Sequence, residues 1–363
     1  MGSNNRMRIL HVSNLGVMPK GVGYLGMPYK ISNGFVRNGH YVVNFSDRDL
    51  AEAMALLPSY LRDRRTGKFA LNKHLIKVSN EFRPDILLLG HADLIKPETI
   101  DIIRSNIPNL TVVQWTCDFP LMEGNKERMQ SKLPVVDFTF CTTAGQALDD
   151  FGAPTGRYGF FPNPVDDSIE IGKSFNCSSD NLKYDLIFTA GSSSHKRKHL
   201  GKFIETGEIG KNILQKFPNI RAYLTGVNAA HVWRSSYEYI LAQSAMGLNI
   251  SYVNDAYLYS SDRLSHMVGN GLLVFIEKST GYNDIFNENE MVFYGSYQEL
   301  YEKIKFYSEN DSCRMRVAES GWKKYHRLFS GVNVTNYMLG VINGRFDPAV
   351  RNFTADDWLS MIT

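Results

Sequence analysis

The stretch from residue 244 to 286 constrains the fold of this chain more than any other. Residues 247–251 (GLNIS) have the composition of a short buried strand, and a polar loop follows them. N-cap residues then predict a helix over residues 262–268, which a Gly-Asn-Gly sequence would end. A second apolar run at residues 272–276 predicts another buried strand. This order of elements predicts an α/β fold.

The start of this predicted helix is a candidate anion site. A helix N-terminus offers unpaired N–H groups and the positive end of its dipole to the preceding loop. Ser260 and Ser261 would supply such groups, and Arg263 adds a fixed positive charge that suits phosphate. The alternative is an ordinary strand–loop–helix unit without a ligand.

Length and composition limit the class of protein. The chain has 363 residues, which is too long for one ordinary α/β core and suggests two domains. The net charge of +3 does not require a nucleic-acid partner. Four widely spaced cysteines form no metal-binding or disulfide pattern. Since no apolar run could span a membrane and no signal sequence is found, we expect a cytoplasmic protein.

A second basic loop follows the predicted strand at residues 184–189. Small residues, among them Gly191 and Ser192, lead into consecutive basic residues that include Lys196 and Arg197. The spacing predicts a helix start here, where cations would oppose the helix dipole. An anion would remove this conflict, so Lys196 and Arg197 are predicted phosphate contacts. The alternative is a charged surface turn.

The first half of the chain predicts a second set of parallel strands. After a strand at residues 7–13 comes a Gly-rich loop, in which Asn14, Gly21 and Gly23 could approach a ligand. Its spacing is not that of a dinucleotide fingerprint, and the alternative is a plain long turn. Residues 47–49 (DRD) are interpreted as acids in the first turn of a helix, not as metal ligands.

Two further residues are expected at the edge of this first sheet. His91 follows the predicted strand at 85–89, and Asp118 follows the one at 111–115. Ligands of open α/β sheets bind beyond the carboxyl ends of the strands. A carboxylate there could orient or deprotonate an acceptor hydroxyl. The alternatives are a capping histidine and a turn-forming aspartate.

Several of these motifs carry a family resemblance. GLNIS, the Arg263–His266 spacing, the G-Y-x-x-x-F segment at 281–286, IFTAGSSSHKRKHL and QWTCDFP together resemble GT-B glycosyltransferases of the group-1 type, in the spore-maturation-protein-like branch. The resemblance implies two Rossmann-like domains facing across a cleft, with a nucleotide-sugar diphosphate at the helix N-terminus. The family usually has Glu in place of His266, where it holds the nucleotide ribose. Histidine can also hydrogen-bond a hydroxyl.

The resemblance also implies a domain division. Residues 1–163 would form the N-terminal acceptor domain, 164–183 a linker, and 184–344 the C-terminal donor domain. A C-terminal helix at about 345–363 would pack back onto the first domain. The donor-binding set would be Gly191, Ser192, Lys196, Arg197, Gly226, Asn249, Ser260, Ser261, Arg263 and His266, with Glu277, Gly281 and Tyr282 near the donor sugar.

The expected activity is transfer of a sugar from a nucleotide-diphosphate sugar to an acceptor hydroxyl, in polysaccharide, lipopolysaccharide or other glycoconjugate synthesis. The enzyme would be hexosyltransferase-like and metal-independent, with no cofactor and with a UDP-sugar as the favoured donor. Its acceptor would be a glycan, a lipid-linked or another hydroxyl compound. A basic patch at residues 62–68 is a candidate contact for the inner face of the membrane. The alternatives are a nucleotide-sugar-binding protein without transferase activity and a nucleotide-sugar 2-epimerase on the same fold.

Overall fold

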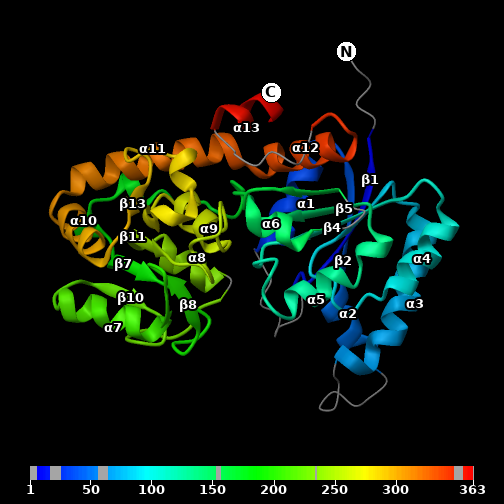
Figure 1. Cartoon of the computed structure of the whole chain (residues 1–363), viewed down its shortest axis with the longest axis horizontal. Coiled ribbons are helices and arrows are strands. Elements are labelled where there is room, and N and C mark those ends of the chain that lie inside the picture. Colours follow the sequence, from blue (N-terminus) through cyan, green and yellow to red (C-terminus); the bar gives the residue numbers. More distant parts are fainter. Residues whose placement is uncertain are drawn as a thin grey trace. The chain divides into compact units, whose positions relative to one another are not determined.

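The computed structural model describes residues 6–16, 26–55, 64–152, 157–233, 235–346 and 355–362. The chain forms two compact units, and its elements are labelled in Figure 1. The first unit consists of Met1–Cys141, Leu148–Phe161 and Gly331–Val350. The second unit consists of Thr142–Ala147, Pro162–Ser330 and Arg351–Thr363. None of the described helices is both long enough and apolar enough to cross a membrane.

The first unit is built on a six-stranded parallel sheet in the order β2-β1-β3-β4-β5-β6. Its strands are β1 (Arg8–Ser13), β2 (Tyr41–Ser46), β3 (Ile86–Leu89), β4 (Thr111–Thr116), β5 (Phe138–Cys141) and β6 (Arg157–Phe160). All four residues of β3 are buried. A strand without polar alternation is expected where helices cover both faces of a parallel sheet.

Helices connect these strands and cover the sheet. They are α1 (Met27–Arg37), α2 (Asp47–Ala53), α3 (Arg64–Phe82), α4 (Pro97–Asn106), α5 (Asn125–Gln130) and α6 (Gln146–Phe151). One core cluster joins Leu10, Leu87 and Val112 of the sheet to Leu71 of α3 and Ile100 of α4. The acids of α2 lie in its first turn, as predicted.

Helix α12 (Gly331–Ile342) belongs to the first unit although it comes late in the chain. It packs against α1 so closely that a Cβ atom on Gly34 would overlap the carbonyl group of Gly331. Asn38 Nδ2 donates hydrogen bonds to Val332 O at 2.9 Å and Thr335 Oγ1 at 2.8 Å. The chain therefore returns to the first unit through α12, although the sequence analysis assigned these residues to the donor domain.

The final helix, α13 (Ala355–Ile362), belongs to the second unit. The Trp358 side chain is buried, and its Nε1 donates to Leu328 O at 2.7 Å. Its ring meets Phe329 edge to face. These contacts join α13 to α11 (Asp311–Phe329) of the second unit. The packing of the last helix onto the first domain stays a prediction.

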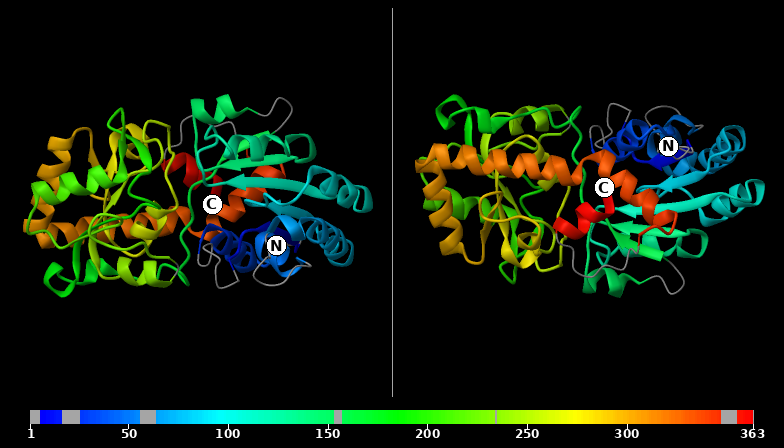
Figure 2. Two further views of the ribbon diagram at one scale, coloured as in Figure 1. Left: turned by 90° about the horizontal axis from the view of Figure 1, so that it is seen from below. Right: turned by 90° about the horizontal axis from the view of Figure 1, so that it is seen from above.

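The second unit contains a five-stranded parallel sheet in the order β10-β7-β11-β12-β13. The strands are β7 (Tyr184–Phe188), β10 (Ala222–Leu224), β11 (Ser244–Asn249), β12 (Leu273–Glu277) and β13 (Val292–Tyr294). The helices are α7 (Thr206–Lys216), α8 (Ser235–Leu241), α9 (Arg263–Gly269), α10 (Tyr297–Glu309) and α11 (Asp311–Phe329). Figure 2 shows α11 as a long helix beside this sheet. Both units are Rossmann-like, as predicted.

The basic run that predicted a helix start forms an antiparallel hairpin instead. Its strands are β8 (Lys196–His199) and β9 (Lys202–Glu205). Both turn residues have positive φ, 49° at Leu200 and 78° at Gly201. Positive φ at both central residues is the mark of a two-residue type I′ turn, whose twist suits a hairpin. The alternating burial of β8 places Arg197 and His199 on one face and exposes Lys196.

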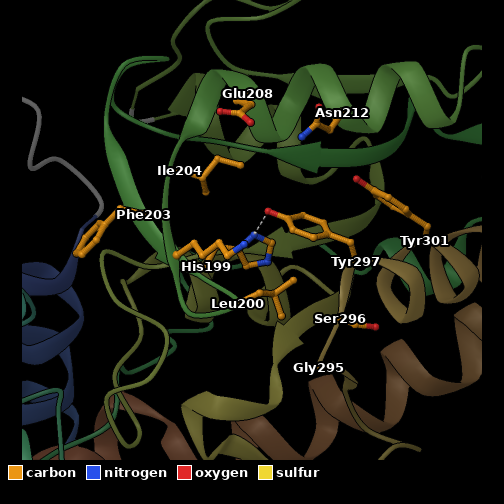
Figure 3. Close-up of a pocket in the computed structure, with 11 residues that line it drawn as sticks. His199, Leu200, Phe203, Ile204, Glu208, Asn212, Gly295, Ser296, Tyr297 and Tyr301 are labelled. Atoms are coloured by element: carbon orange, nitrogen blue, oxygen red, sulfur yellow. Dashed lines mark hydrogen bonds between the residues drawn. The ribbon is translucent and has the colours of Figure 1, made fainter.

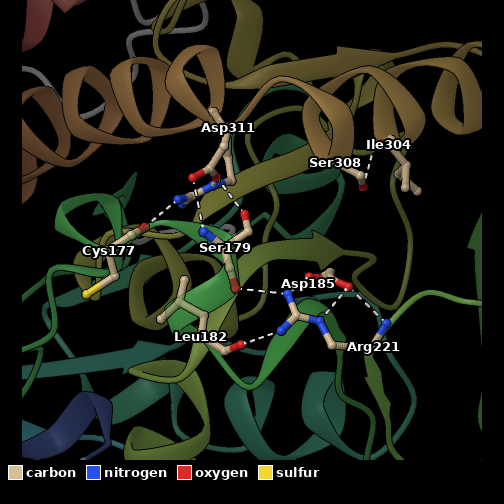
Figure 4. A network of polar contacts seen from close by, with 9 residues as sticks. Cys177, Ser179, Leu182, Asp185, Arg221, Ile304, Ser308 and Asp311 are labelled. Carbon is tan, nitrogen blue, oxygen red and sulfur yellow. Dashed lines mark hydrogen bonds and ion pairs between the residues drawn. The ribbon is translucent and has the colours of Figure 1, made fainter.

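The segment expected to be a linker, residues 164–183, is held to the rest of the second unit by hydrogen bonds near its C-terminal end (Figure 4). Arg221 donates to the backbone oxygens of Leu182 and Ser179, both at 2.8 Å, and pairs with Asp185. The buried Arg314 donates to Cys177 O at 2.6 Å. Two arginines of the second unit therefore fix residues 177–182, which sequence composition alone marked as a loop.

Candidate active site

The carboxyl ends of β3 and β4 bring the two predicted rim residues together. His91 Nε2 lies 3.5 Å from Asp118 Oδ2, and both side chains are half-buried. Burial lowers the pKa of His91, and the charge of Asp118 opposes this shift in part. The imidazole is therefore neutral at pH 7, with a carboxylate beside it. Either group could accept a proton from a hydroxyl at this edge of the sheet.

Two basic residues of this edge were missed by the sequence analysis. Arg128 of α5 donates to His91 O at 2.8 Å and to Asn125 Oδ1, so it fixes the backbone that carries His91. Lys132 is buried, and burial together with the charge of Arg128 lowers its pKa to about 8. Neither residue belongs to a recognisable motif; only the fold places Arg128 beside His91 and Lys132 within electrostatic reach of Arg128.

The other predicted features of this unit are described only in part. Asn14 directly follows β1 and is half-buried. Gly21 and Gly23 lie outside the described residues, as do Arg62 of the basic patch and the side chains of Arg64 and Arg65. Their predicted roles as cleft loop and membrane contact remain predictions.

In the second unit, two guanidinium groups lie within electrostatic reach of one another. Burial and the charge of Arg263 together lower the pKa of Arg197 to about 9, and Tyr259 opposes part of this shift. Arg197 Nε is buried and has no hydrogen-bond partner within the described part of the chain. Arg263 Nη2 donates only a long bond, 3.3 Å, to Ile250 O. Two neighbouring cations with unused donors form a site suited to an anion.

Other polar atoms without partners occur at the ends of β10 and β11. Asn249 is completely buried, yet neither its Oδ1 nor its Nδ2 makes a hydrogen bond to any described residue. The same holds for Thr225 Oγ1 and Ser261 Oγ. Buried polar groups are almost always hydrogen-bonded, so each exception needs an explanation. A bound polar ligand at the carboxyl edge of the sheet would explain all of them.

Several predicted donor residues are used inside the protein. Ser260 is buried, and its Oγ accepts from Asn163 at 3.0 Å and lies 2.8 Å from the Tyr282 hydroxyl. The amide of Ser261 donates to Ser251 Oγ at 2.9 Å, so this amide is not available to a phosphate. Gly281 has a positive φ and leaves room for the Tyr257 ring. Ser260 and Gly281 therefore make contacts within the protein, whereas Ser261 Oγ has no partner among the described residues.

Glu277 also has an internal role. Its carboxylate accepts from Leu200 N at 3.0 Å, Asn254 Nδ2 at 3.1 Å and Ser279 Oγ at 2.5 Å. It thereby fastens the β8–β9 turn to the end of β12. A carboxylate offers about four acceptor positions, so the predicted contact of Glu277 with the donor sugar stays a prediction.

The small residues of the predicted phosphate loop keep that loop compact. Gly226 has a positive φ of 75°, and a Cβ atom there would lie 2.9 Å from Ser193 Cβ. Gly191 lies against the His195 ring. Ser192 Oγ is 2.9 Å from Ser194 Oγ. The structure places these residues after β7 and β10, next to Thr225.

His266 lies between two glutamates that the sequence analysis did not single out. Its Nδ1 is 2.8 Å from Glu170 Oε1 and 2.8 Å from Glu238 Oε1. These residues come from the segment after β6 and from α8, which packs against α9. Nothing in their sequence spacing predicts this meeting. The ring that was expected to hold a ribose hydroxyl thus faces two carboxylates with Nδ1.

A cavity of about 550 Å³ opens beside the hairpin, between it and helices α7 and α10 (Figure 3). His199 and Tyr297 form part of its wall, with their Nδ1 and hydroxyl 3.2 Å apart. Burial lowers the pKa of His199 to about 4 and raises that of Tyr297 to about 12, so both are uncharged at pH 7. The cavity is lined by residues of β8, β9, α7 and α10 and does not include Arg197 or Arg263.

The second unit resembles known proteins in sequence. Residues 206–340 match a protein family described as glycosyl transferase-like. The match contains α9 with Arg263 but begins after Arg197. No curated protein matches the chain.

Solved structures resemble the whole chain in fold. HepE of Anabaena in complex with UDP has a TM-score of 0.54 at 12% identity, over 93% of this chain and 100% of that one. The complex of HepE with UDP-glucose gives the same values. A glycosyltransferase from Rickettsia africae has a TM-score of 0.53 at 11% identity, over 94% and 98% of the two chains. The chain therefore has the GT-B fold of two Rossmann-like domains, and its residues 206–340 are glycosyl transferase-like.

Proposed function

We propose that this protein is a GT-B glycosyltransferase that moves a sugar from a nucleotide-diphosphate sugar to an acceptor hydroxyl. The observation that carries the proposal is the cluster of buried polar atoms without partners at the carboxyl edge of the second sheet, around the Arg197–Arg263 pair. A diphosphate between the two guanidinium groups would supply the missing acceptors. A nucleoside beyond it would reach Asn249 and Thr225.

The reaction follows from these groups. Positive charge placed at the diphosphate stabilises the leaving group as negative charge develops on it. Because two guanidinium groups supply that charge, the diphosphate needs no metal ion in this proposal. In the first unit, Asp118 with its neighbour His91 would orient the acceptor hydroxyl and take its proton.

The proposal also includes the identity of the sugar donor, the class of acceptor and the cellular location of the reaction. A UDP-hexose is the favoured donor, since HepE of similar fold has been solved with UDP and UDP-glucose. The acceptor would be a glycan or a lipid-linked hydroxyl compound, met in the cytoplasm or at the inner face of the membrane. Membership of the spore-maturation-protein-like branch is part of the same proposal.

Two arginines and one lysine test the donor site. Titration calorimetry with UDP should show about 10- to 100-fold weaker binding for Arg197→Ala and for Arg263→Ala, because each removes a charge-assisted hydrogen bond. Lys196→Ala is the matched control: it removes the same charge from the same strand, but on the exposed face. Equal binding by all four proteins would contradict the donor site.

Turnover distinguishes the transferase from its alternatives. The protein is incubated with UDP-, GDP-, dTDP-, ADP- and CMP-sugars, with and without a panel of acceptors. Nucleotide release that depends on an acceptor supports the transferase. An isomerised sugar without acceptor would identify a 2-epimerase, and tight binding without any turnover would identify a binding protein.

A further inference from the structure

Three side chains with metal-ligand chemistry converge inside the second unit. His266 Nδ1 lies 2.8 Å from Oε1 of Glu170 and of Glu238. The three ligand atoms all lie within 4.8 Å of one another. The side chains of Glu170 and His266 are 0% and 6% exposed, and that of Glu238 is 13% exposed. The cluster is therefore a buried centre and not a group of surface acids.

The second oxygen of each glutamate is held by the protein. Glu170 Oε2 accepts from Asp166 N at 2.8 Å, and Glu238 Oε2 accepts from Asn270 Nδ2 at 2.7 Å. Asn270 is itself fixed, because its Oδ1 accepts from Gly172 N at 2.9 Å. These bonds direct both Oε1 atoms toward the same ring nitrogen. Outer hydrogen bonds that orient carboxylates in this way are a regular feature of metal sites.

The geometry of the cluster suits a cation. One ring nitrogen carries at most one hydrogen, so it cannot donate a full hydrogen bond to both carboxylate oxygens. A divalent cation between the three side chains would contact both Oε1 atoms and the lone pair of a neutral Nδ1 at the same time.

We propose that Glu170, Glu238 and His266 form a structural site for a divalent transition metal of the Zn²⁺ or Mn²⁺ type. A mixed nitrogen and oxygen ligand set suits these ions better than Mg²⁺ or Ca²⁺, which prefer oxygen alone. Metal–ligand bonds of about 2.1 Å require the ligand atoms to separate by a few tenths of an ångström from 2.8 Å. A water molecule would complete the coordination.

The site would join three separate parts of the second unit. Glu170 lies in the segment after β6, Glu238 in α8 and His266 in α9, one turn after Arg263. A metal that binds only the folded arrangement of these ligands stabilises the fold by its binding free energy. Its role is to fix α9, and it takes no part in the reaction.

Metal titration of the full chain tests the proposal. Protein freed of metal with EDTA and then of EDTA is titrated with ZnCl₂ and with MnCl₂. We expect binding of one ion per chain and a rise in Tm of at least about 3 °C at roughly 100 times the Kd. MgCl₂ at the same concentration should give a smaller rise. Glu170→Gln and Glu238→Gln should each lose at least about 10-fold in affinity.

A nearby ion pair provides the control. His326 Nδ1 lies 2.8 Å from Asp167 Oδ1, and Asp167→Asn removes one carboxylate from this pair without touching the cluster. It should bind metal as the wild type does. Absence of binding by the wild type, or equal binding by Glu238→Gln and the wild type, would overturn the proposal.

Stability without metal separates the site from a simple ion triad. If the cluster is a metal site, metal-free Glu238→Gln should be at least as stable as the metal-free wild type, because it carries one repelling charge less. If an imidazolium holds both carboxylates, the same substitution lowers Tm in EDTA, and that result would overturn the proposal. Glu170→Gln provides a second, independent measurement should Glu238→Gln not fold.

Discussion

The role proposed for Asp118 can be separated from donor binding by mutation, because Asp118 lies in the first unit and the proposed anion site lies in the second. We predict that Asp118→Asn leaves the Kd for UDP unchanged and lowers kcat by about 100-fold or more, since general base catalysis contributes at least that much. Calorimetry and an acceptor-dependent transfer assay measure the two quantities.

The control for this prediction is the same substitution elsewhere in the sheet. Asp137 precedes β5 and accepts a hydrogen bond from Val112 N at 2.7 Å, at the amino end of the strands. Asp137→Asn should leave kcat within about threefold of the wild type once folded protein is compared. An unchanged kcat in Asp118→Asn would remove Asp118 from the mechanism.

His11 gives the chain a predictable sensitivity to acid. Its Nε2 accepts from Trp115 Nε1 at 3.2 Å, and its Nδ1 lies 2.8 Å from Ser32 Oγ. Ser32 in turn donates to Asn44. This assigns the proton to Nδ1 of a neutral ring, and burial lowers the pKa of His11 to about 3.

The sign of the effect follows from proton uptake. Between pH 6.5 and about 3, the unfolded chain binds a proton at His11 that the folded chain does not, so the free energy of unfolding falls as the pH falls. Between pH 6.5 and 4 the loss from this residue is on the order of 3 kcal/mol. Urea unfolding at several pH values should show a shallower acid loss for His11→Gln, and parallel curves for the two proteins would contradict the assignment.

At the scale of elements, the contact between α1 and α12 is set by two glycines. Gly34→Ala should gain up to about 1 kcal/mol from helix propensity but lose about 1–3 kcal/mol from overlap with the Gly331 backbone. We therefore predict a net loss of stability, measured by urea unfolding. Val36→Ala on the exposed face of the same helix should change stability by about 0.5 kcal/mol or less. A stabilised Gly34→Ala protein would show that the helices can move apart freely.

Most elements could be predicted, because their apolar runs are long and their ends carry Gly or Pro. The hairpin could not. Residues 196–199 contain no apolar periodicity, and only the positive φ angles at Leu200 and Gly201 reveal a turn. The difference between a helix and a strand matters for the site. At a helix N-terminus, Lys196 and Arg197 would both lie near the same end of the helix. In the strand, their side chains point to opposite faces.

The candidate site divides in the same way. The meeting of His91 with Asp118 could be predicted because residues just beyond the carboxyl ends of neighbouring parallel strands lie at one edge of their sheet. In the second unit, the position of Arg263 at the start of a helix could be predicted from the N-cap residues before it. Glu170 and Glu238 could not, since they lie 96 and 28 residues before His266 and meet it only through tertiary packing. The hydrogen bonds that Glu277 makes within the protein could not be predicted either, since Leu200, Asn254 and Ser279 reach it only in the folded chain.

At the scale of the whole molecule, the first unit depends on residues from the far end of the chain. A fragment ending at residue 163 lacks α12 and exposes the face of α1 around Gly34. We predict that this fragment melts without a cooperative transition and that a peptide of residues 331–346 restores one. A peptide of residues 355–362, which belongs to the second unit, is the control and should have no effect. Cooperative melting of the fragment alone would contradict this dependence.

The hairpin also has a consequence for how such proteins diversify. It stands outside both parallel sheets, turns within two residues, and contributes Arg197 from one face while its turn is tied to Glu277 by a single amide. Insertions between residues 200 and 201, or substitutions at these two positions, would change the length or the charge of the hairpin without shifting a strand of either parallel sheet. If Arg197 binds the donor as proposed, changes in this turn can alter the surroundings of the donor at little cost to folding.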